Sequence, residues 1–215
     1  MKWWAYQGPP ATKSEADCTH GGCLIVLLGM SDLTSITIQP PDDISPDGLA
    51  RLSVEKFIAE GLTISPPQHP TGVLAQRAGA FVTLRTLAGD LRGCIGTTEP
   101  AHSTVAEEII QNAIHSATRD PRFPPVTVGE LADLTYGVDV LSAPEPVLGP
   151  GDLDAVRFGV IIETLDANRR ALLLPGIQGI DTVDQQWQAV HQKAGIRLGE
   201  PVRVERFTVT RFGKD

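Results

Sequence analysis

The 215-residue sequence has few cysteines, few aromatic residues and no long apolar run. Three cysteines are too few, and odd in number, for the disulfide framework of a small secreted domain. The longest apolar run, Cys23 to Met30, falls far short of the roughly 20 residues that cross a bilayer. The first residues also lack an apolar region of signal-peptide length. These absences together indicate a cytoplasmic protein without a membrane-spanning helix.

Basic residues are also few, and they do not cluster. Lys and Arg number 18 against 26 Asp and Glu, which gives a net charge of -8. Nucleic acids and acidic membrane surfaces repel such a chain, so we expect neither as a partner. Motifs for nucleotide phosphates, dinucleotides and serine hydrolases are absent as well. The sequence therefore predicts no cofactor and contains no complete set of acid, base and nucleophile.

Metal ligands are sparse. Cys18, His20 and Cys23 place three soft ligands close together near the start of the chain. A structural zinc site normally takes four ligands, and the sequence has no second close pair of cysteine or histidine to complete such a site. We therefore expect no bound metal.

The composition is that of an ordered globular protein, with 41% hydrophobic and 20% charged residues. Residues 1–43 differ from the rest, because they are mostly polar before the short apolar run Leu24–Leu28 and end in a Pro-Asp linker. We interpret 1–43 as an N-terminal extension and Leu24–Leu28 as a short buried strand. The domain proper then covers residues 44–215.

Helix and hairpin signals mark the first half of this domain. Ser45 before a proline predicts one helix start, and Thr104 with Glu107 predicts a capping box at a second helix. Between these helices, the runs Gly79–Leu87 and Leu91–Thr97 flank a Gly-Asp turn. We expect these two runs to pair as a β-hairpin.

The second half repeats this mixture. Ala143–Gly151 holds three prolines and two glycines, and we interpret it as the approximate hinge between two subdomains. A second hairpin follows, then a helix capped near Thr182 with His191 on its surface. A closing strand, Val202–Arg211, shows a slip in alternation that predicts a bulge. Hairpins interleaved with helices predict an α+β fold: two subdomains of mainly antiparallel sheet with flanking helices.

The candidate site lies on the second strand of the first hairpin. Side chains alternate in direction along a strand, so Arg92, Cys94 and Gly96 share one face. A fixed positive charge beside a thiol lowers its pKa, and the thiolate is the reactive form. Cys94, with Arg92 beside it, is therefore the candidate catalytic nucleophile or redox thiol. The alternative is that Cys94 is a small hydrophobic residue in the core.

Neighbouring residues are candidates for binding a ligand. Glycines on either side of Cys94 allow a ligand or other backbone to come close. The guanidinium of Arg92 and the start of the following helix both favour an anionic ligand. We also expect the loop Asp120–Phe123 to return to this strand and to form a second wall of the binding cleft. The candidate ligand-binding residues are Arg92, Gly93, Cys94, Gly96, Thr97, Glu99, Asp120 and Arg122.

The segment Leu91–Thr97 resembles the signature heptapeptide of the AMMECR-one domain family, which is named for an Alport-syndrome chromosomal region. The resemblance extends from about Asp47 to Phe212 and includes further blocks in the same order. These blocks are Asp120–Pro125, Glu130–Leu131, Val138–Leu141, Pro144–Glu145, Leu173–Pro175 and Lys193–Gly195. The resemblance implies the fold of this family but no established reaction.

Two functions from different classes fit these observations. The first is an accessory or partner-binding protein that uses a cleft around Leu91–Thr97. The second is an enzyme that acts on a small polar or anionic molecule through Cys94. The resemblance implies a pathway shared with Memo-like and radical-SAM proteins, beside which such domains are encoded in many prokaryotes. We favour the binding function because the sequence contains no complete catalytic set.

Overall fold

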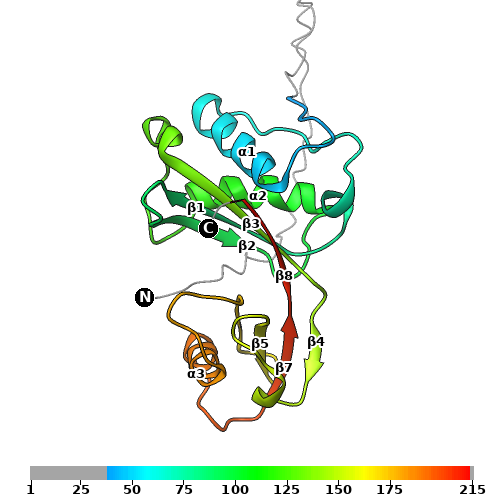
Figure 1. Cartoon of the computed structure of the whole chain (residues 1–215), viewed down its shortest axis with the longest axis vertical. Coiled ribbons are helices and arrows are strands. Elements are labelled where there is room, and N and C mark those ends of the chain that lie inside the picture. The colour runs from blue at the N-terminus through cyan, green and yellow to red at the C-terminus, as the bar shows by residue number, and fades with distance from the viewer. Residues whose placement is uncertain (1–37, 214–215) are drawn as a thin grey trace, which may run out of the picture.

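Residues 38–213, which the computed structural model describes, form two antiparallel sheets with packed helices (Figure 1). This arrangement confirms the α+β class and the two sheets expected from the hairpins. Most of the expected N-terminal extension, including Leu24–Leu28 and the group around Cys18, lies outside the described residues, so the domain boundary at residue 43 stays a prediction. Within 38–213, no helix is both long and apolar enough to cross a bilayer.

The first sheet and two helices form what we call the first lobe. Its strands lie in the order β2-β1-β3-β8, and the two helices pack against the sheet and against each other. The strands are β1 (Ala80–Thr86), β2 (Leu91–Gly96), β3 (Leu134–Leu141) and β8 (Val209–Gly213), and the helices are α1 (Pro46–Glu60) and α2 (Val105–Thr118). Apolar side chains such as Leu84 and Ile109 are fully buried between sheet and helices.

The second sheet and one helix form what we call the second lobe. Its strands lie in the order β4-β7-β5-β6, and the helix packs on β5 and β6. The elements are β4 (Glu145–Val147), β5 (Gly159–Thr164), β6 (Arg170–Leu173), α3 (Val183–Ala194) and β7 (Val202–Phe207). Three short 3-10 helices lie in the connections: η1 (Gly72–Ala75), η2 (Val128–Asp133) and η3 (Pro150–Asp152).

The predicted helix starts are confirmed. Ser45 Oγ accepts the N–H of Gly48 at 3.2 Å and so caps α1. Thr104 and Glu107 form the predicted capping box at α2. Gly61 ends α1 in the left-handed conformation, with φ of 71°, which glycine adopts without the steric cost of a Cβ. Residues close together in the sequence therefore determine where these helices begin and end.

The first hairpin also forms as predicted. β1 pairs with β2 in antiparallel orientation, and Thr83 lies opposite Cys94. Gly89 in the turn between them has a φ of 89°, which favours glycine. Among the strands of residues 38–213, β2 has β1 as its neighbour on one side and no strand on the other, so it is an edge strand of the first sheet. The segment that resembles the family signature thus lies at an edge of the first sheet.

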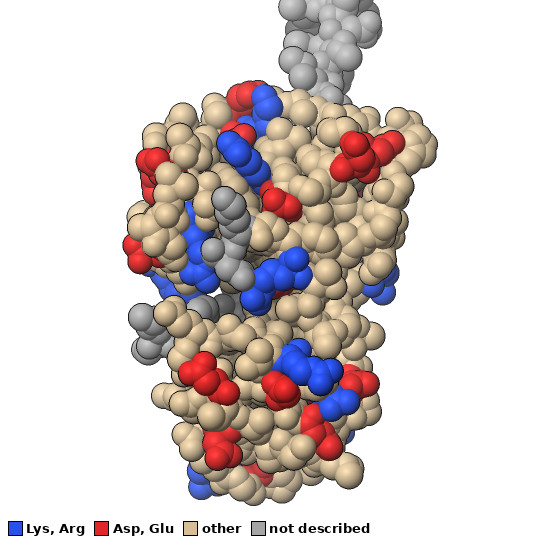
Figure 2. Space-filling view, viewed as in Figure 1, with Lys and Arg blue, Asp and Glu red and all other residues tan. Residues whose placement is uncertain are grey.

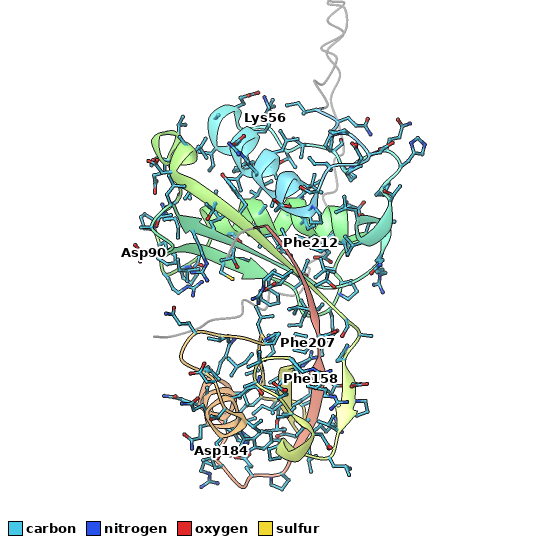
Figure 3. All side chains as sticks on the ribbon, in the orientation of Figure 1. Lys56, Asp90, Phe158, Asp184, Phe207 and Phe212 are labelled. Carbon is cyan, nitrogen blue, oxygen red and sulfur yellow. The ribbon has the colours of Figure 1, made fainter. Side chains whose placement is uncertain are left out.

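The closing strand differs from the prediction. The run Val202–Arg211 is divided at Thr208 into β7, which pairs in the second sheet, and β8, which pairs with β3 in the first. The slip in alternation, between Val204 and Phe207, is not a bulge, because β7 pairs with β5 without a shift in register. Val204 and Phe207 are three positions apart on a regular strand, so they face opposite sides and are buried in two different cores, and the chain passes to the other sheet at Thr208. Figure 3 shows the result, with Phe212 in the first lobe and Phe207 where the second lobe meets it.

Two crossings of the chain and a small core join the lobes. The first crossing, Ala143–Gly151, includes β4 and η3, and its role as a hinge stays a prediction. Cys94 packs against the core between the two sheets, which consists of Phe81, Leu141, Ile161, Leu172 and Phe207. Cys94 therefore lies on the face of the first sheet that meets the second lobe.

Candidate functional site

The close approach of α2 accounts for Gly93. A Cβ at this position would lie 2.2 Å from the carbonyl oxygen of Ser116, a distance that real Cβ atoms do not reach. The Ser116 hydroxyl also accepts the N–H of Ile95 and donates to the carbonyl of Val82, both at 2.8 Å. The helix thus covers this face of β2, and packing alone is a sufficient reason for the glycine.

The second glycine of the signature is also packed. A Cβ on Gly96 would lie 2.3 Å from the ring of Phe81. Phe81 stands opposite Gly96 in β1 and belongs to the core between the lobes. Gly96 therefore makes room for an aromatic ring that joins the two lobes.

Thr97 and Glu99 connect the end of β2 to other elements. Glu108, fully buried in α2, accepts the hydroxyl of Thr97 at 2.8 Å and the N–H of His102 at 2.7 Å. Glu99 is exposed and pairs with Arg170 of the second lobe at 2.7 Å. Thr97 thus ties the strand to α2, and Glu99 ties it to the second lobe. Sequence reasoning missed Glu108, because its position in the helix shows no sign that the carboxylate is buried.

The loop after α2 covers the edge of β2, as predicted. Asp120 Oδ2 accepts the N–H of Cys94 at 2.8 Å, and Arg122 Nη2 donates to the carbonyl of Cys94 at 3.3 Å. Asp120 and Arg122 also form an ion pair, with 2.6 Å between Oδ2 and Nη2. An open strand edge is a place where another strand can add, and here two side chains satisfy the backbone of Cys94 instead.

The carboxylate of Asp120 is buried and charged. Its side chain is 2% exposed. Burial raises the pKa of this carboxyl, but the hydrogen bonds from Arg122 and from the N–H of Cys94 together outweigh burial and lower the pKa below its usual value. Asp120 therefore holds the loop on β2 as an anion and is not a proton donor at neutral pH.

Arg92 is paired with Glu130. Its Nε and Nη2 donate to the two carboxylate oxygens of Glu130 at 2.7 and 3.3 Å, and its Nη1 donates to the carbonyl of Pro124 at 2.9 Å. The bonds from Arg92 and from the N–H of Thr127 lower the pKa of Glu130 to about 2. A carboxylate within the chain therefore matches the charge of Arg92. Sequence reasoning did not identify Glu130 as this partner.

The Cys94 thiol is not activated in the expected way. Cys94 is half-buried, and Thr83 Oγ1 donates to its sulfur at 3.3 Å. Burial raises the pKa of the Cys94 thiol above its ordinary value, and the opposing effects of Thr83 and Arg122 do not outweigh burial. The expected lowering of this pKa is therefore wrong, because the sulfur is desolvated and Arg92 pairs with Glu130.

Folding also brings Lys193 to this place, although the sequence did not predict it as a site residue. Lys193 lies in the last turn of α3, and its Nζ donates to the carbonyl of Leu172 at 2.9 Å. Burial lowers the pKa of the Lys193 ammonium, and Cys94 and Arg122 are near enough to act on that pKa as well. We call Cys94, Asp120, Arg122 and Lys193 the boundary cluster.

His191 of the same helix corrects another prediction. It is 2% exposed and does not lie on the surface. Its Nδ1 lies 2.9 Å from the carbonyl of Trp187, and its ring packs against the ring of Trp187. A helix pattern that counts apolar residues misses a polar residue that packs through its ring.

On the face drawn in Figure 2, the molecule narrows to a waist between the lobes. Figure 2 shows Lys and Arg side chains on both sides of this waist on the face drawn. A pocket of about 190 Å³ lies elsewhere, and its lining residues are Ile64, Pro66, His102, Glu107, Ile110 and Gln111. A cleft around Leu91–Thr97 therefore stays a prediction.

Metal ligands do not come together in residues 38–213. No group of three His, Cys, Asp or Glu side chains in this range is placed to hold a metal ion. The ligands Cys18, His20 and Cys23 lie outside the described residues. Neither the expectation about these ligands nor the expected lack of a cofactor is tested by the structure.

Comparisons with known proteins extend over most of the chain. A sequence model of the AMMECR1 family matches residues 48–213. A protein of Thermotoga maritima is 47% identical over 161 residues, which cover 74% of this chain and 91% of that protein. A protein of Clostridium acetobutylicum is 40% identical over 165 residues. That match covers 76% of this chain but 34% of the relative, so the chain spans about a third of the Clostridium protein.

A solved structure shares the fold. The crystal structure of the uncharacterised protein PH0010 from Pyrococcus horikoshii matches with a TM-score of 0.72 and 32% sequence identity. The match covers 79% of this chain and 90% of that chain. None of these relatives carries a name that states an activity.

Proposed function

The chain belongs to the AMMECR1 family, and we propose that it is an accessory protein that binds a partner at the boundary cluster. In this proposal Cys94 lines the binding site and is not a nucleophile. The proposal rests on the surroundings of the sulfur: a hydroxyl, Thr83 Oγ1, donates to it at 3.3 Å, and burial raises the pKa of the thiol. A thiol that stays protonated at neutral pH is a poor nucleophile, because the thiolate is the reactive form.

The surroundings of Cys94 also support binding over catalysis. Thr83 Oγ1 donates to the Cys94 sulfur, and the guanidinium of Arg122 also interacts with the Cys94 side chain; neither a hydroxyl nor a guanidinium is a base at neutral pH. The ion pair of Asp120 and Arg122 is held on β2 by two bonds to the backbone of Cys94. Charges that are held in place before a partner arrives reduce the entropy cost of binding.

The partner that we propose is a Memo-like or a radical-SAM protein, because the family resemblance implies a shared pathway with both. The Clostridium relative supports an association with other domains, since about two thirds of that protein lies outside the match. We also propose a cytoplasmic location, where a reducing environment keeps Cys94 as a free thiol.

Thiol reactivity tests the proposal against the enzyme alternative. In a Cys18→Ser/Cys23→Ser variant, Cys94 is the one remaining cysteine, and mass spectrometry follows its alkylation by iodoacetamide from neutral to alkaline pH. We expect slow alkylation at neutral pH and faster alkylation above the ordinary pKa of a thiol. The urea-unfolded variant is the control for full reactivity. Rapid alkylation of the folded protein at neutral pH would favour the enzyme instead.

Partner binding tests the boundary cluster directly. We expect Arg122→Gln to weaken binding of the partner roughly tenfold or more in isothermal calorimetry, because charge-assisted contacts are lost. Arg51→Gln is the matched control, since the Arg51 side chain is 62% exposed on α1 and pairs with Glu55. A thermal melt shows that each variant is folded. If neither a Memo-like nor a radical-SAM protein binds the wild-type chain, the proposed partners are wrong.

A further inference from the structure

Lys193 is a cation that the ion pairs at the lobe boundary leave unmatched. Arg122 pairs with Asp120 at 2.6 Å, and Arg211 pairs with Asp139 at 2.7 Å. In residues 38–213, by contrast, Lys193 forms no ion pair with a carboxylate. Within residues 38–213, the boundary therefore carries one positive charge without a carboxylate partner.

The hydrogen bonds of Lys193 are also incomplete. An ammonium has three N–H donors, and within the described chain one of them is used, by the carbonyl of Leu172 at 2.9 Å. The Lys193 residue is partly buried, so water solvates the other donors less well than it solvates a surface lysine. An approaching anion therefore lowers the free energy of a poorly solvated ammonium more than that of a fully hydrated one.

We propose that Lys193 binds the carboxylate of a ligand that enters the boundary cluster. One unmatched positive charge is balanced by a monoanion, whereas a phosphate dianion leaves excess negative charge close to Asp120 and Asp139. A carboxylate also offers two oxygens to the two remaining N–H donors. This inference rests on the proposed function, because it names the chemical group that a partner presents at the same site.

Acetate is the simplest probe of this site, and inorganic phosphate is the comparison. We titrate each into the ¹⁵N-labelled full chain at constant ionic strength and follow amide chemical shifts. Saturable shifts at Cys94 and Arg122 are expected with acetate, and a weaker response is expected with phosphate. These two amides are informative because both residues belong to the boundary cluster and lie near Lys193.

Three variants assign the effect to the charge of Lys193. Lys193→Met keeps an apolar stem but removes the charge, and it should weaken acetate binding roughly tenfold or more. Lys193→Arg keeps a positive charge and should retain most of the binding. Lys56→Met is the matched control, because Lys56 lies on α1, far from the boundary in Figure 3, and it should change nothing.

The carboxylate can belong to a free small molecule or to the C-terminus of a partner chain. A short peptide with a free C-terminus is titrated beside the same peptide with an amidated C-terminus. If the free peptide binds more tightly than acetate and amidation abolishes its binding, the ligand is the C-terminus of a chain. If the free peptide binds no more tightly than acetate, the ligand is a free small carboxylate. Either result supports the inference if the Lys193→Met substitution weakens the binding that is observed.

Equal acetate affinity in wild type and in Lys193→Met overturns the inference, as does tighter binding of phosphate than of acetate. If a thermal melt shows that Lys193→Met is unfolded, the test uses the wild-type chain instead. It then measures whether acetate protects Lys193 from modification by an N-hydroxysuccinimide ester. Peptide mapping should then show that excess acetate slows the modification of Lys193 and leaves that of Lys56 unchanged. No difference between the two lysines overturns the inference as well.

The experiments distinguish failure of the proposed function from failure of the carboxylate inference. If the wild-type chain binds neither partner protein but binds acetate through Lys193, the proposed partners are wrong and the carboxylate site stands. If a partner binds through Arg122 but acetate binding does not depend on Lys193, the carboxylate inference is wrong and the proposed function stands.

Discussion

Strand β2 meets α2 on one side, and it meets the loop 120–125 and the second lobe on the other. On the α2 side the contact is backbone to backbone, since a Cβ on Gly93 would collide with the carbonyl of Ser116. On the other side charged groups, Asp120 and Arg122, satisfy the strand edge at Cys94. The same seven-residue segment thus combines a rigid packing surface with a polar one, and the polar surface is the one suited to binding.

The two sides should respond differently to substitution. A backbone contact against a helix cannot relax without moving the helix, so a collision there is costly. Side chains of the loop 120–125 can shift more easily than packed backbone, and side chains at the exposed outer rim can become hydrated, so their loss costs less. We therefore expect effects on stability to fall from the α2 side, through the loop 120–125, to the outer rim of the lobe boundary.

The largest effect is expected for Gly93→Ala. The added Cβ would lie 2.2 Å from the carbonyl oxygen of Ser116, so either α2 or β2 must shift, and the free energy of unfolding should fall by roughly 3 kcal/mol. Urea denaturation measures this loss. Gly129→Ala is the matched control, because nothing lies within 4 Å of a Cβ added there. Equal stabilities of the two variants would contradict the account of the α2 side.

An intermediate effect is expected for Asp120→Asn. The change removes the negative charge that accepts hydrogen bonds from Arg122 and from the N–H of Cys94, and the free energy of unfolding should fall by about 2 kcal/mol. Urea denaturation at neutral pH is again the measurement. Asp90→Asn is the control, since Asp90 is exposed in the turn of the first hairpin (Figure 3). If the free energy of unfolding fell as much as in Gly93→Ala, the expected difference between the α2 side and the loop side of β2 would be wrong.

Acidification should show the same contribution of Asp120. Its pKa in the folded protein is lowered, so its stabilising effect is fully present above the unfolded pKa of about 3.9 and is lost as pH falls through the folded pKa. Glu130, whose pKa is lowered to about 2, titrates in the same acidic range. The wild type should therefore lose more stability on acidification than Asp120→Asn, and the difference isolates Asp120. Parallel curves would show that Asp120 is not stabilised as an anion.

The smallest effect is expected at the rim. Glu99 pairs with Arg170 across the lobe boundary at 2.7 Å, but the Glu99 side chain is 72% exposed. A double-mutant cycle of Glu99→Ala and Arg170→Ala should give a coupling below about 1 kcal/mol, and added salt should reduce it. A coupling larger than the effect of Asp120→Asn would place the main electrostatic contact between the lobes at Glu99 instead.

Much of the fold could be predicted from the sequence. The capping signals at Ser45, Thr104 and Thr182 were correct, and the first hairpin formed around its glycine turn. The prediction for the closing strand was wrong in one respect: β7 has no bulge between Val204 and Phe207, and the run divides at Thr208 into strands of two different sheets. A period-two pattern shows which residues of a strand share a face, but it does not show which sheet the strand joins.

The candidate site was predicted less well than the fold. The approach of Asp120 and Arg122 to Cys94 was expected from the helix that joins them, and it is confirmed. The charge partner of Arg92, which is Glu130, and the presence of Lys193 were not expected. Each of these contacts joins residues that are far apart in the sequence, and without the fold nothing indicates which residues meet.

The sequence by itself determined the helix starts, the hairpin turn and the family, because each depends on residues a few positions apart or on an ordered set of short blocks. The tertiary structure alone decided the ionisation of Cys94 and the placing of Lys193. A pKa reflects how far a group is desolvated and which charges surround it, and at this site folding sets both. For that reason the sequence left both a reactive thiol and a packed thiol open at Cys94, and only the fold shows that burial raises the pKa of this thiol.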